Sequence, residues 1–309
     1  MTKFVLARLA SALLIIFGVS CLVFMLMHLI PGDPIDVMLG ETAHPTDKDA
    51  LRKAMGLHLP LHIQLLHYLQ RLLHLDLGTS IHSGRAVTTI LLERFPATLE
   101  LGAGAITIAM LVAFPLGIFA ALRQHTVIDA GAMAFALTGV SIPNFWLGPL
   151  LIMGGALWLG WFPVSGRNGL LSLVLPALTL GTAMAAILSR MIRSAVLEVI
   201  HEDFIRTAQA KGLGATQTVF RHALRNALLP VLTLLGLQFG ALLSGAVITE
   251  TIFSWPGIGS LMIEAIQQRD YPIVQGTILW ISLMYIGINL VTDVLYALAD
   301  PRIRLRHPS

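Results

Sequence analysis

The amino-acid sequence predicts an all-α, polytopic membrane protein with six transmembrane helices. Hydrophobic residues make up 56% of the 309 residues and charged residues only 12%, and the mean hydropathy is +0.79. A soluble protein carries roughly 25% charged residues because its surface faces water. A chain with about half that share must present much of its surface to lipid.

Six stretches without Asp, Glu, Lys or Arg supply the predicted transmembrane helices. A helix needs about 20 apolar residues to cross a hydrocarbon core of about 30 Å, and all but the third stretch are close to that length. The third stretch contains three prolines and is predicted to make one crossing over Gly131–Gly160, followed by a short turn at Trp161–Asn168. The six stretches are Leu9–Ile30, Leu101–Leu122, Ala130–Gly166, Asn168–Ser189, Asn226–Thr249 and Tyr271–Thr292.

Basic residues in the short connecting segments predict the orientation, because cytoplasmic loops are enriched in Lys and Arg. If the N-terminus is cytoplasmic, only Arg167 and Arg269 fall in short external loops. The basic residues that then fall inside are Lys3, Arg8, Arg123, Arg190, Arg193, Arg206, Lys211, Arg221, Arg225, Arg302, Arg304 and Arg306. This asymmetry predicts that both termini are cytoplasmic.

The chain divides into three predicted parts: residues 1–30 with the first transmembrane helix, an external lobe over 31–96, and a membrane core over 97–309. In the lobe, Pro60 opens a helix with an amphipathic leucine stripe. We expect the stripe to pack onto the membrane-embedded body, and the alternative is that it lies on the lipid surface. The stripe consists of Leu61, Leu65, Leu69 and Leu73.

A cytoplasmic loop over 190–229 carries the most distinctive local pattern. Glu202 and Asp203 favour a helix N-terminus, where the helix dipole stabilises negative charge. Gly212 and Gly214 then end that helix, so the sequence predicts a short helix, a turn and a second helix outside the membrane. Small residues near Ala210 would let another protein approach closely. A plain connecting loop is the alternative.

The same loop resembles the coupling loop of oligopeptide and dipeptide ATP-binding-cassette (ABC) importer permeases, and the resemblance extends along nearly the whole chain. The motifs that carry it are Leu29-Ile30-Pro31-Gly32-Asp33-Pro34, Asp76-Leu77-Gly78-Thr79-Ser80, Pro96-Ala97-Thr98-Leu99-Glu100-Leu101, Ser141-Ile142-Pro143-Asn144-Phe145-Trp146, Asp203–Leu213, Arg221–Pro230, Trp255-Pro256-Gly257-Ile258-Gly259, Arg269-Asp270-Tyr271-Pro272 and Asp300-Pro301-Arg302-Ile303-Arg304. One departure is that Ala208 stands where the broader ABC importer signature has glutamate.

The resemblance implies a set of partners and a coupling role for the loop. The partners are a second homologous permease, two ATPase subunits and an extracytoplasmic binding protein, in a bacterial inner membrane. ATP and Mg²⁺ would be bound by the ATPase subunits, and none of the four lysines of this chain follows a glycine, as a phosphate-binding loop requires. The candidate coupling residues are Glu202, Asp203, Arg206, Thr207, Ala208, Ala210, Lys211, Gly212 and Gly214.

Polar side chains at membrane depth are candidates for lining a pathway or for bonding neighbouring helices. The candidates are Asn144, Gln238, Ser244 and Asn289. Glu250 is expected at the membrane interface. His58 and His62 have the spacing of two metal ligands on one helix, but no third ligand has diagnostic spacing, so no metal site is predicted. The net charge of +3 is explained by topology and does not indicate nucleic-acid binding.

The sequence therefore predicts a permease subunit of an ABC importer for peptides. Nickel complexes, glutathione or another small solute are alternative cargoes. A self-sufficient ion-coupled transporter is a rival class, but it would need carboxylates near the bilayer midplane, and every acid here lies near the end of a stretch. A membrane enzyme would need a nucleophile or metal constellation, and the sequence suggests none.

Overall fold

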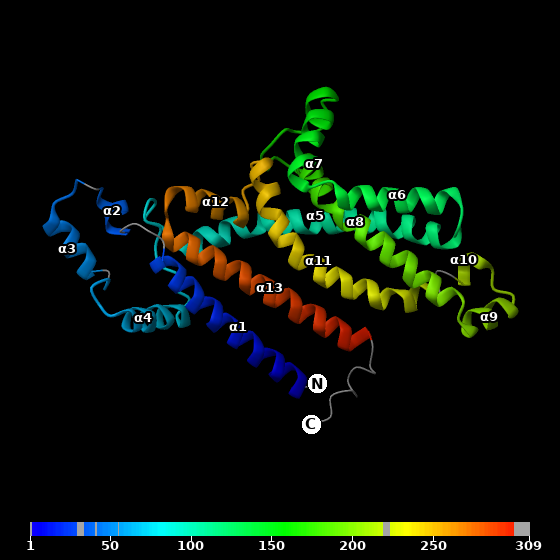
Figure 1. Cartoon of the computed structure of the whole chain (residues 1–309), viewed down its shortest axis with the longest axis horizontal. Coiled ribbons are helices and arrows are strands. Elements are labelled where there is room, and N and C mark those ends of the chain that lie inside the picture. Colours follow the sequence, from blue (N-terminus) through cyan, green and yellow to red (C-terminus); the bar gives the residue numbers. More distant parts are fainter. Residues whose placement is uncertain (1, 30–33, 41, 55, 219–222, 300–309) are drawn as a thin grey trace. The chain divides into compact units, whose positions relative to one another are not determined.

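The computed structural model of the chain describes residues 2–29, 34–40, 42–54, 56–218 and 223–299 (Figure 1). This part of the chain consists of helices and their connections, with one isolated β-bridge between Thr79 and Ala86. The prediction of an all-α protein is confirmed. The motifs at 29–34 and 300–304 lie partly or wholly outside the described residues.

The helices follow one another along the chain as labelled in Figure 1. They are α1 (Thr2–Leu29), α2 (Pro34–Leu39), α3 (Pro45–Ala54), α4 (Leu61–Leu73), α5 (Val87–Leu122), α6 (Val127–Ser141), α7 (Asn144–Leu151), the π-helical η1 (Ile152–Trp158), α8 (Leu170–Ile200), α9 (Asp203–Ala210), α10 (Ala215–Thr218), α11 (Leu224–Ile252), α12 (Ile258–Gln268) and α13 (Tyr271–Ala299).

Three helices in the described part are long and apolar enough to cross a membrane by themselves: α5, α8 and the Tyr271–Thr292 portion of α13. Shorter apolar helical stretches lie at Ala10–Leu26 in α1 and Pro230–Gly240 in α11. Each overlaps a predicted stretch, although α5 begins before Leu101 and α8 continues beyond Ser189. The protein is thus a helical membrane protein, and the count of six crossings stays a prediction.

The third predicted crossing, Gly131–Gly160, is not one continuous helix. α6 and the α7–η1 segment are bent by 103° relative to each other at the break between Ser141 and Asn144. Pro143 explains the break, because the residue before a proline is driven out of the helical region, and Ile142 has the extended ψ of 115°. The stretch is therefore a bent pair of helices, and its assignment to one crossing stays a prediction.

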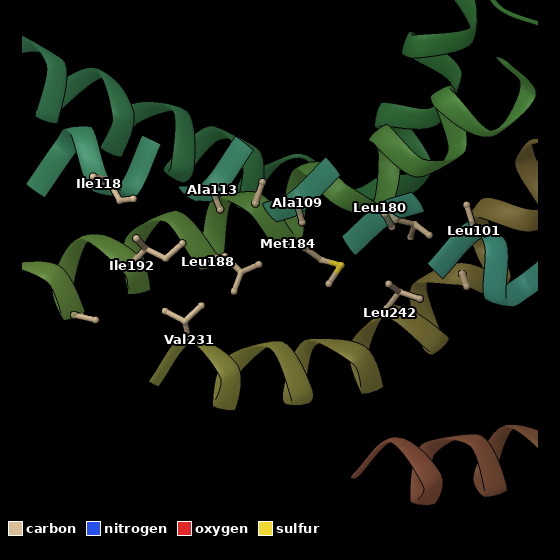
Figure 2. Close-up of a cluster of buried hydrophobic side chains, with 14 of the residues drawn as sticks. Leu101, Ala109, Ala113, Ile118, Leu180, Met184, Leu188, Ile192, Val231 and Leu242 are labelled. Carbon is tan, nitrogen blue, oxygen red and sulfur yellow. The ribbon is translucent and has the colours of Figure 1, made fainter. Parts of the chain in front are cut away.

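The chain forms two compact units, and the larger one comprises residues 97–255 and 287–309. Its core lies between α5, α8 and α11, and Figure 2 shows the inward side chains of these helices. Along α5 every fourth residue is fully buried, and three of these four residues are alanine. The four are Leu101, Ala105, Ala109 and Ala113.

Glycines bring α8 close to its neighbours. A Cβ atom at Gly117 of α5 would stand 2.7 Å from the Ser189 carbonyl oxygen of α8, and one at Gly139 of α6 would stand 3.0 Å from the Ala186 Cβ. Such close backbone approach is how membrane helices gain packing contacts without a hydrophobic driving force. α8 is therefore held tightly against both α5 and α6.

The second unit comprises residues 1–96 and 256–286. One of its clusters joins the start of α5 to α12 and α13 through Val87, Ile258 and Ile273. Another joins α1, α4 and α13 through Phe24, Tyr68 and Leu279.

The leucine stripe of α4 is only partly buried. Leu65 and Leu69 pack against the Phe24–Tyr68–Leu279 cluster, as predicted. Leu73, predicted to belong to the same stripe, is 83% exposed. The packing face contains Tyr68 instead, and burial raises the pKa of Tyr68 to about 12.

Candidate functional site

The candidate coupling segment forms a short helix, α9, as the acidic and glycine residues around it predict. Glu202 is the N-cap with extended ψ. Asp203 lies in the first turn, where its negative charge interacts favourably with the positive end of the helix dipole. The Thr207 hydroxyl donates to the Asp203 carbonyl oxygen at 2.9 Å, and Arg206 lies 3.7 Å from the Asp203 carboxylate. Both contacts join residues within the same short helix, and the Arg206–Asp203 ion pair is highly exposed, so it adds little stability.

Gly212 ends α9 in a left-handed turn. Its φ is +86°, its N–H donates to the Gln209 carbonyl oxygen, and the Leu213 N–H donates to the Ala208 carbonyl oxygen. These two bonds define a Schellman motif, in which glycine at the position after the C-cap Lys211 avoids the strain that a Cβ atom would cause. Gly212 thus sets the direction in which the chain leaves α9.

Gly214 contributes differently from Gly212. Its φ lies outside the left-handed region, and its carbonyl oxygen accepts from both the N–H and the hydroxyl of Thr218, each at 3.0 Å. It therefore marks the beginning of α10 and does not make the turn.

α9 has one buried face and one exposed face. Ile205 and Ala208 are buried, so the side chain of Ala208 does not lie on the outward surface. The remaining candidate residues are exposed: Glu202, Asp203, Arg206, Thr207, Ala210, Lys211, Gly212 and Gly214. The exposed face is polar apart from the small Ala210 and from Phe204, which is 42% exposed.

The loop is shorter than the predicted 190–229, because α8 continues to Ile200 and α11 begins at Leu224. Part of the Arg221–Pro230 motif, which follows α10, lies outside the described residues. The segment that leaves the long helices is therefore 201–223, with α9 directly after the end of α8.

Sequence reasoning did not find an ion pair between α6 and α8. Both carboxylate oxygens of Asp129 accept from Arg193, at 2.6 Å from Nε and 2.8 Å from Nη2, and the His125 N–H donates to the same carboxylate. The side chain of Asp129 is 8% exposed and that of Arg193 is 21% exposed. A signal was present, since Asp129 is the one acidic residue between Glu100 and Glu198.

Two of the sequence motifs meet around Glu250 at the end of α11. The Thr98 hydroxyl donates to the Glu250 carboxylate at 2.8 Å, and the Trp255 indole N–H donates to the Ala97 carbonyl oxygen at 2.8 Å. Glu250 is fully buried within the protein, and its expected position at the membrane interface stays a prediction. The Pro96–Leu101 and Trp255–Gly259 motifs are thus contact partners in the fold.

Two further motifs meet in the other unit. The Ser80 hydroxyl donates to the Asp270 carboxylate at 2.6 Å, and both residues are buried. Asp270 also accepts from the Ile273 N–H, so it caps the first turn of α13. The Asp76–Ser80 and Arg269–Pro272 motifs are thus contact partners in the fold.

Comparison with known proteins places the chain in a family. The model of the binding-protein-dependent transport system inner membrane component matches residues 113–305, and the model of the N-terminal part of such components matches residues 1–102. The chain belongs to this family. The resemblance drawn from the motifs is therefore confirmed.

Relatives of this permease share its full length. It is 45% identical to the di/tripeptide transport system permease protein DppB of Pseudomonas aeruginosa, over 98% of this chain and 99% of the relative. It is 42% identical to the dipeptide transport system permease protein DppB of Escherichia coli K12, over the same shares. It is also 42% identical to the glutathione transport system permease protein GsiC of Salmonella choleraesuis, over 99% and 100%.

A solved structure supports the fold of the permease. The inward-facing MetNI methionine ABC transporter matches with a TM-score of 0.59, covering 69% of this chain and 97% of the matched chain at 17% identity. At this identity the match concerns the fold alone. It agrees with the helical membrane architecture described above.

The candidate pathway residues of the permease lie on three different helices. Asn144 is half-buried at the first position of α7, directly after the break, and Asn289 is half-buried in α13. Gln238 of α11 is buried, and its amide nitrogen has no hydrogen-bond partner among the described residues. The side chain of Ser244 lies outside what the structure describes.

Three histidines of the permease line an open groove beside α4: His58, His67 and His74. His62, predicted as the partner of His58, does not line it. Among the described residues no group of three or more His, Cys, Asp or Glu side chains has the geometry to hold a metal ion.

Proposed function

We propose that the chain is the permease subunit of an ABC importer that takes up short peptides delivered by an extracytoplasmic binding protein. The observation that carries the proposal is the 45% identity, over nearly the full length, to a di/tripeptide permease. Because the match spans both matched family segments, it covers the membrane helices and the coupling segment together. These relatives give no support to an ion-coupled transporter or a membrane enzyme.

Glutathione is the second candidate cargo. The 42% identity to a glutathione permease also spans the full length, and glutathione is itself a three-residue peptide. Nickel complexes lack such support from these relatives. Cargo in such a system depends on the binding protein as well as on the permease, so identity of the permease alone favours the class of short peptides.

The permease would work with a second homologous permease, two ATPase subunits and the binding protein. ATP and Mg²⁺ would be bound by the ATPase subunits, and this chain itself would hold no cofactor. We infer that the exposed face of α9 contacts an ATPase subunit. α9 directly follows the long helix α8, and the turn at Gly212 fixes the direction in which the chain leaves α9. Movement of the ATPase would then reach α8 through a short, rigid connection.

Uptake by the reconstituted transporter tests the cargo. The complete complex in vesicles, with its binding protein, should accumulate a radiolabelled dipeptide only when ATP is supplied to the ATPase subunits. Unlabelled dipeptide should compete, and unlabelled nickel should not. Accumulation of glutathione with no accumulation of any dipeptide or tripeptide would favour the second candidate, and uptake without ATP would contradict the proposal altogether.

Cysteine labelling tests the orientation, in which we propose that both termini and α9 are cytoplasmic. In a Cys21→Ala background, a cysteine at the exposed Ser83 should react with an impermeant reagent in intact cells. A cysteine at the exposed Gln217 should react only after the membrane is opened. Labelling of Gln217→Cys in intact cells would reverse the proposed topology.

A further inference from the structure

α4 runs antiparallel to the last turns of α1. The His28 imidazole lies 3.2 Å from the Gln64 side-chain oxygen, and the rings of Phe24 and Tyr68 have centroids 5.7 Å apart. Residue numbers fall along α1 as they rise along α4, and four residues separate the contacts on both helices. α4 therefore lies beside the C-terminal end of α1 (Figure 1), which belongs to the uncharged stretch Leu9–Ile30 and is the end expected to leave the membrane.

One edge of α4, beside the face that packs on α1, exposes leucines. Leu66 is 54% exposed, Leu73 is 83% exposed and Leu75, just after the helix, is 79% exposed. In water such an edge would be unfavourable, at about 25 cal/mol for each Å² of apolar surface. Beside a helix that leaves the bilayer, the same edge can lie in the acyl-chain boundary.

Leu75 occupies a backbone position that normally takes glycine. Its φ is +57°, its N–H donates to the Leu72 carbonyl oxygen, and the Asp76 N–H donates to the Arg71 carbonyl oxygen. This is a Schellman turn with leucine at the left-handed position, where a Cβ atom is strained. Packing within the described residues does not explain the leucine, because most of its side chain is exposed.

An open groove of about 780 Å³ lies along the polar side of α4. Lys53 and Arg71 supply two permanent positive charges, His58, His67 and His74 supply further nitrogen donors, and Asp76 is the one acid in the lining. The groove and the leucine edge lie on the same short helix. A molecule with a negative head and an apolar body would satisfy both.

We propose that this groove and the leucines beside it form a binding site for an anionic phospholipid. The headgroup phosphate would lie between Lys53 and Arg71, and the acyl chains would lie along Leu66, Leu73 and Leu75. The proposal is independent of the cargo, since it concerns only the lobe and the end of α1. A phospholipid fits better than a soluble anion because a free anion would leave the leucine edge in water.

Lipid retention by the assembled transporter tests the site, with phosphatidylglycerol as the probe. The complex, exchanged into nanodiscs that contain phosphatidylglycerol in phosphatidylcholine, should retain phosphatidylglycerol on delipidation, as counted by native mass spectrometry. Lys53→Gln with Arg71→Gln should weaken that retention about twenty-fivefold, since each basic residue near a membrane surface contributes about fivefold. Arg85→Gln is the matched control, because Arg85 is an exposed arginine of the same unit that pairs with Glu93 and does not line the groove.

A second variant separates lipid binding from folding. Leu75→Asn removes the apolar side chain and places at this position a residue that tolerates the left-handed region. It should leave the thermal unfolding temperature unchanged or higher, yet weaken phosphatidylglycerol retention about tenfold, the equivalent of burying one leucine.

Three results would overturn the proposal. The first is unchanged phosphatidylglycerol retention in the Lys53/Arg71 variant. The second is displacement of the lipid by free glycerol phosphate at the same concentration, which would make the groove a site for soluble anions. The third is a loss of binding-protein affinity in the same variant in phosphatidylcholine nanodiscs, which would make the groove a protein contact.

Discussion

Gly212→Val should abolish transport while leaving a folded permease in the membrane. Gly212 has a φ of +86°, and a Cβ atom there costs about 1–2 kcal/mol. That cost is small beside the stability of a folded protein, so the chain will relax the turn and the rest of the fold will persist. The relaxed turn would redirect the chain between α9 and α10. ATP-dependent peptide uptake should fall to background, and ATP hydrolysis should lose its stimulation by loaded binding protein.

Ala210→Trp tests the proposed contact between the exposed face of α9 and an ATPase subunit. Ala210 is the last residue of α9 and is exposed, so a larger side chain can be accommodated within the permease itself. It would hold an ATPase subunit away from α9. We expect uptake to be lost and the ATPase to copurify in reduced amount.

Two controls accompany these variants. Gly212→Asn should transport nearly normally, because asparagine tolerates the left-handed region. Gln124→Trp places the same bulky side chain in the exposed loop between α5 and α6, which the proposed topology puts on the same side of the membrane, and should have no effect. If Gly212→Val and Ala210→Trp transport at normal rates with the ATPase bound, the segment is only a connector.

The features predicted correctly from sequence depend on local pattern. The helix from Asp203 and its end at Gly212 follow from charge and glycine placement within a dozen residues, which is the range over which backbone preferences act. The long apolar helices α5, α8 and α13 follow from hydropathy for the same reason.

The features that sequence missed depend on tertiary contacts or on competing local rules. Asp129 and Arg193 are 64 positions apart, and no periodicity joins them. The break at Pro143 was visible as a proline, but an apolar stretch of this length is equally compatible with a kinked crossing and a bent pair. The exposed Leu73 looked equivalent to Leu65 because helical spacing does not show which edge of a stripe a neighbour covers.

Replacing Arg193 by Gln should destabilise the permease and impair transport. Its guanidinium makes two hydrogen bonds to Asp129, whose side chain is 8% exposed, so the variant leaves a nearly buried carboxylate without its counter-charge. Removing one partner leaves the other charge without its counter-charge, and the partial exposure of Arg193 limits the loss of stability. We expect a clear drop in the thermal unfolding temperature of the purified permease.

The effect on transport follows from the position of the pair. Arg193 lies two helical turns before the end of α8 at Ile200, and α9 begins directly beyond it. The Asp129–Arg193 pair therefore connects α6 to the C-terminal end of α8. This is the end of α8 next to α9, so a movement of α9 would act on it first. Without it, we expect ATP hydrolysis to continue while uptake per ATP falls.

The double variant Asp129→Asn with Arg193→Gln distinguishes this coupling from simple stability. Removing both charges together leaves no unpaired carboxylate, so the unfolding temperature should recover most of the loss. Uptake per ATP should stay low, because amide side chains cannot restore the two charge-assisted bonds between α6 and α8. Recovery of uptake along with stability would show that the pair only supports folding, and that α6 needs no fixed connection to α8 during transport.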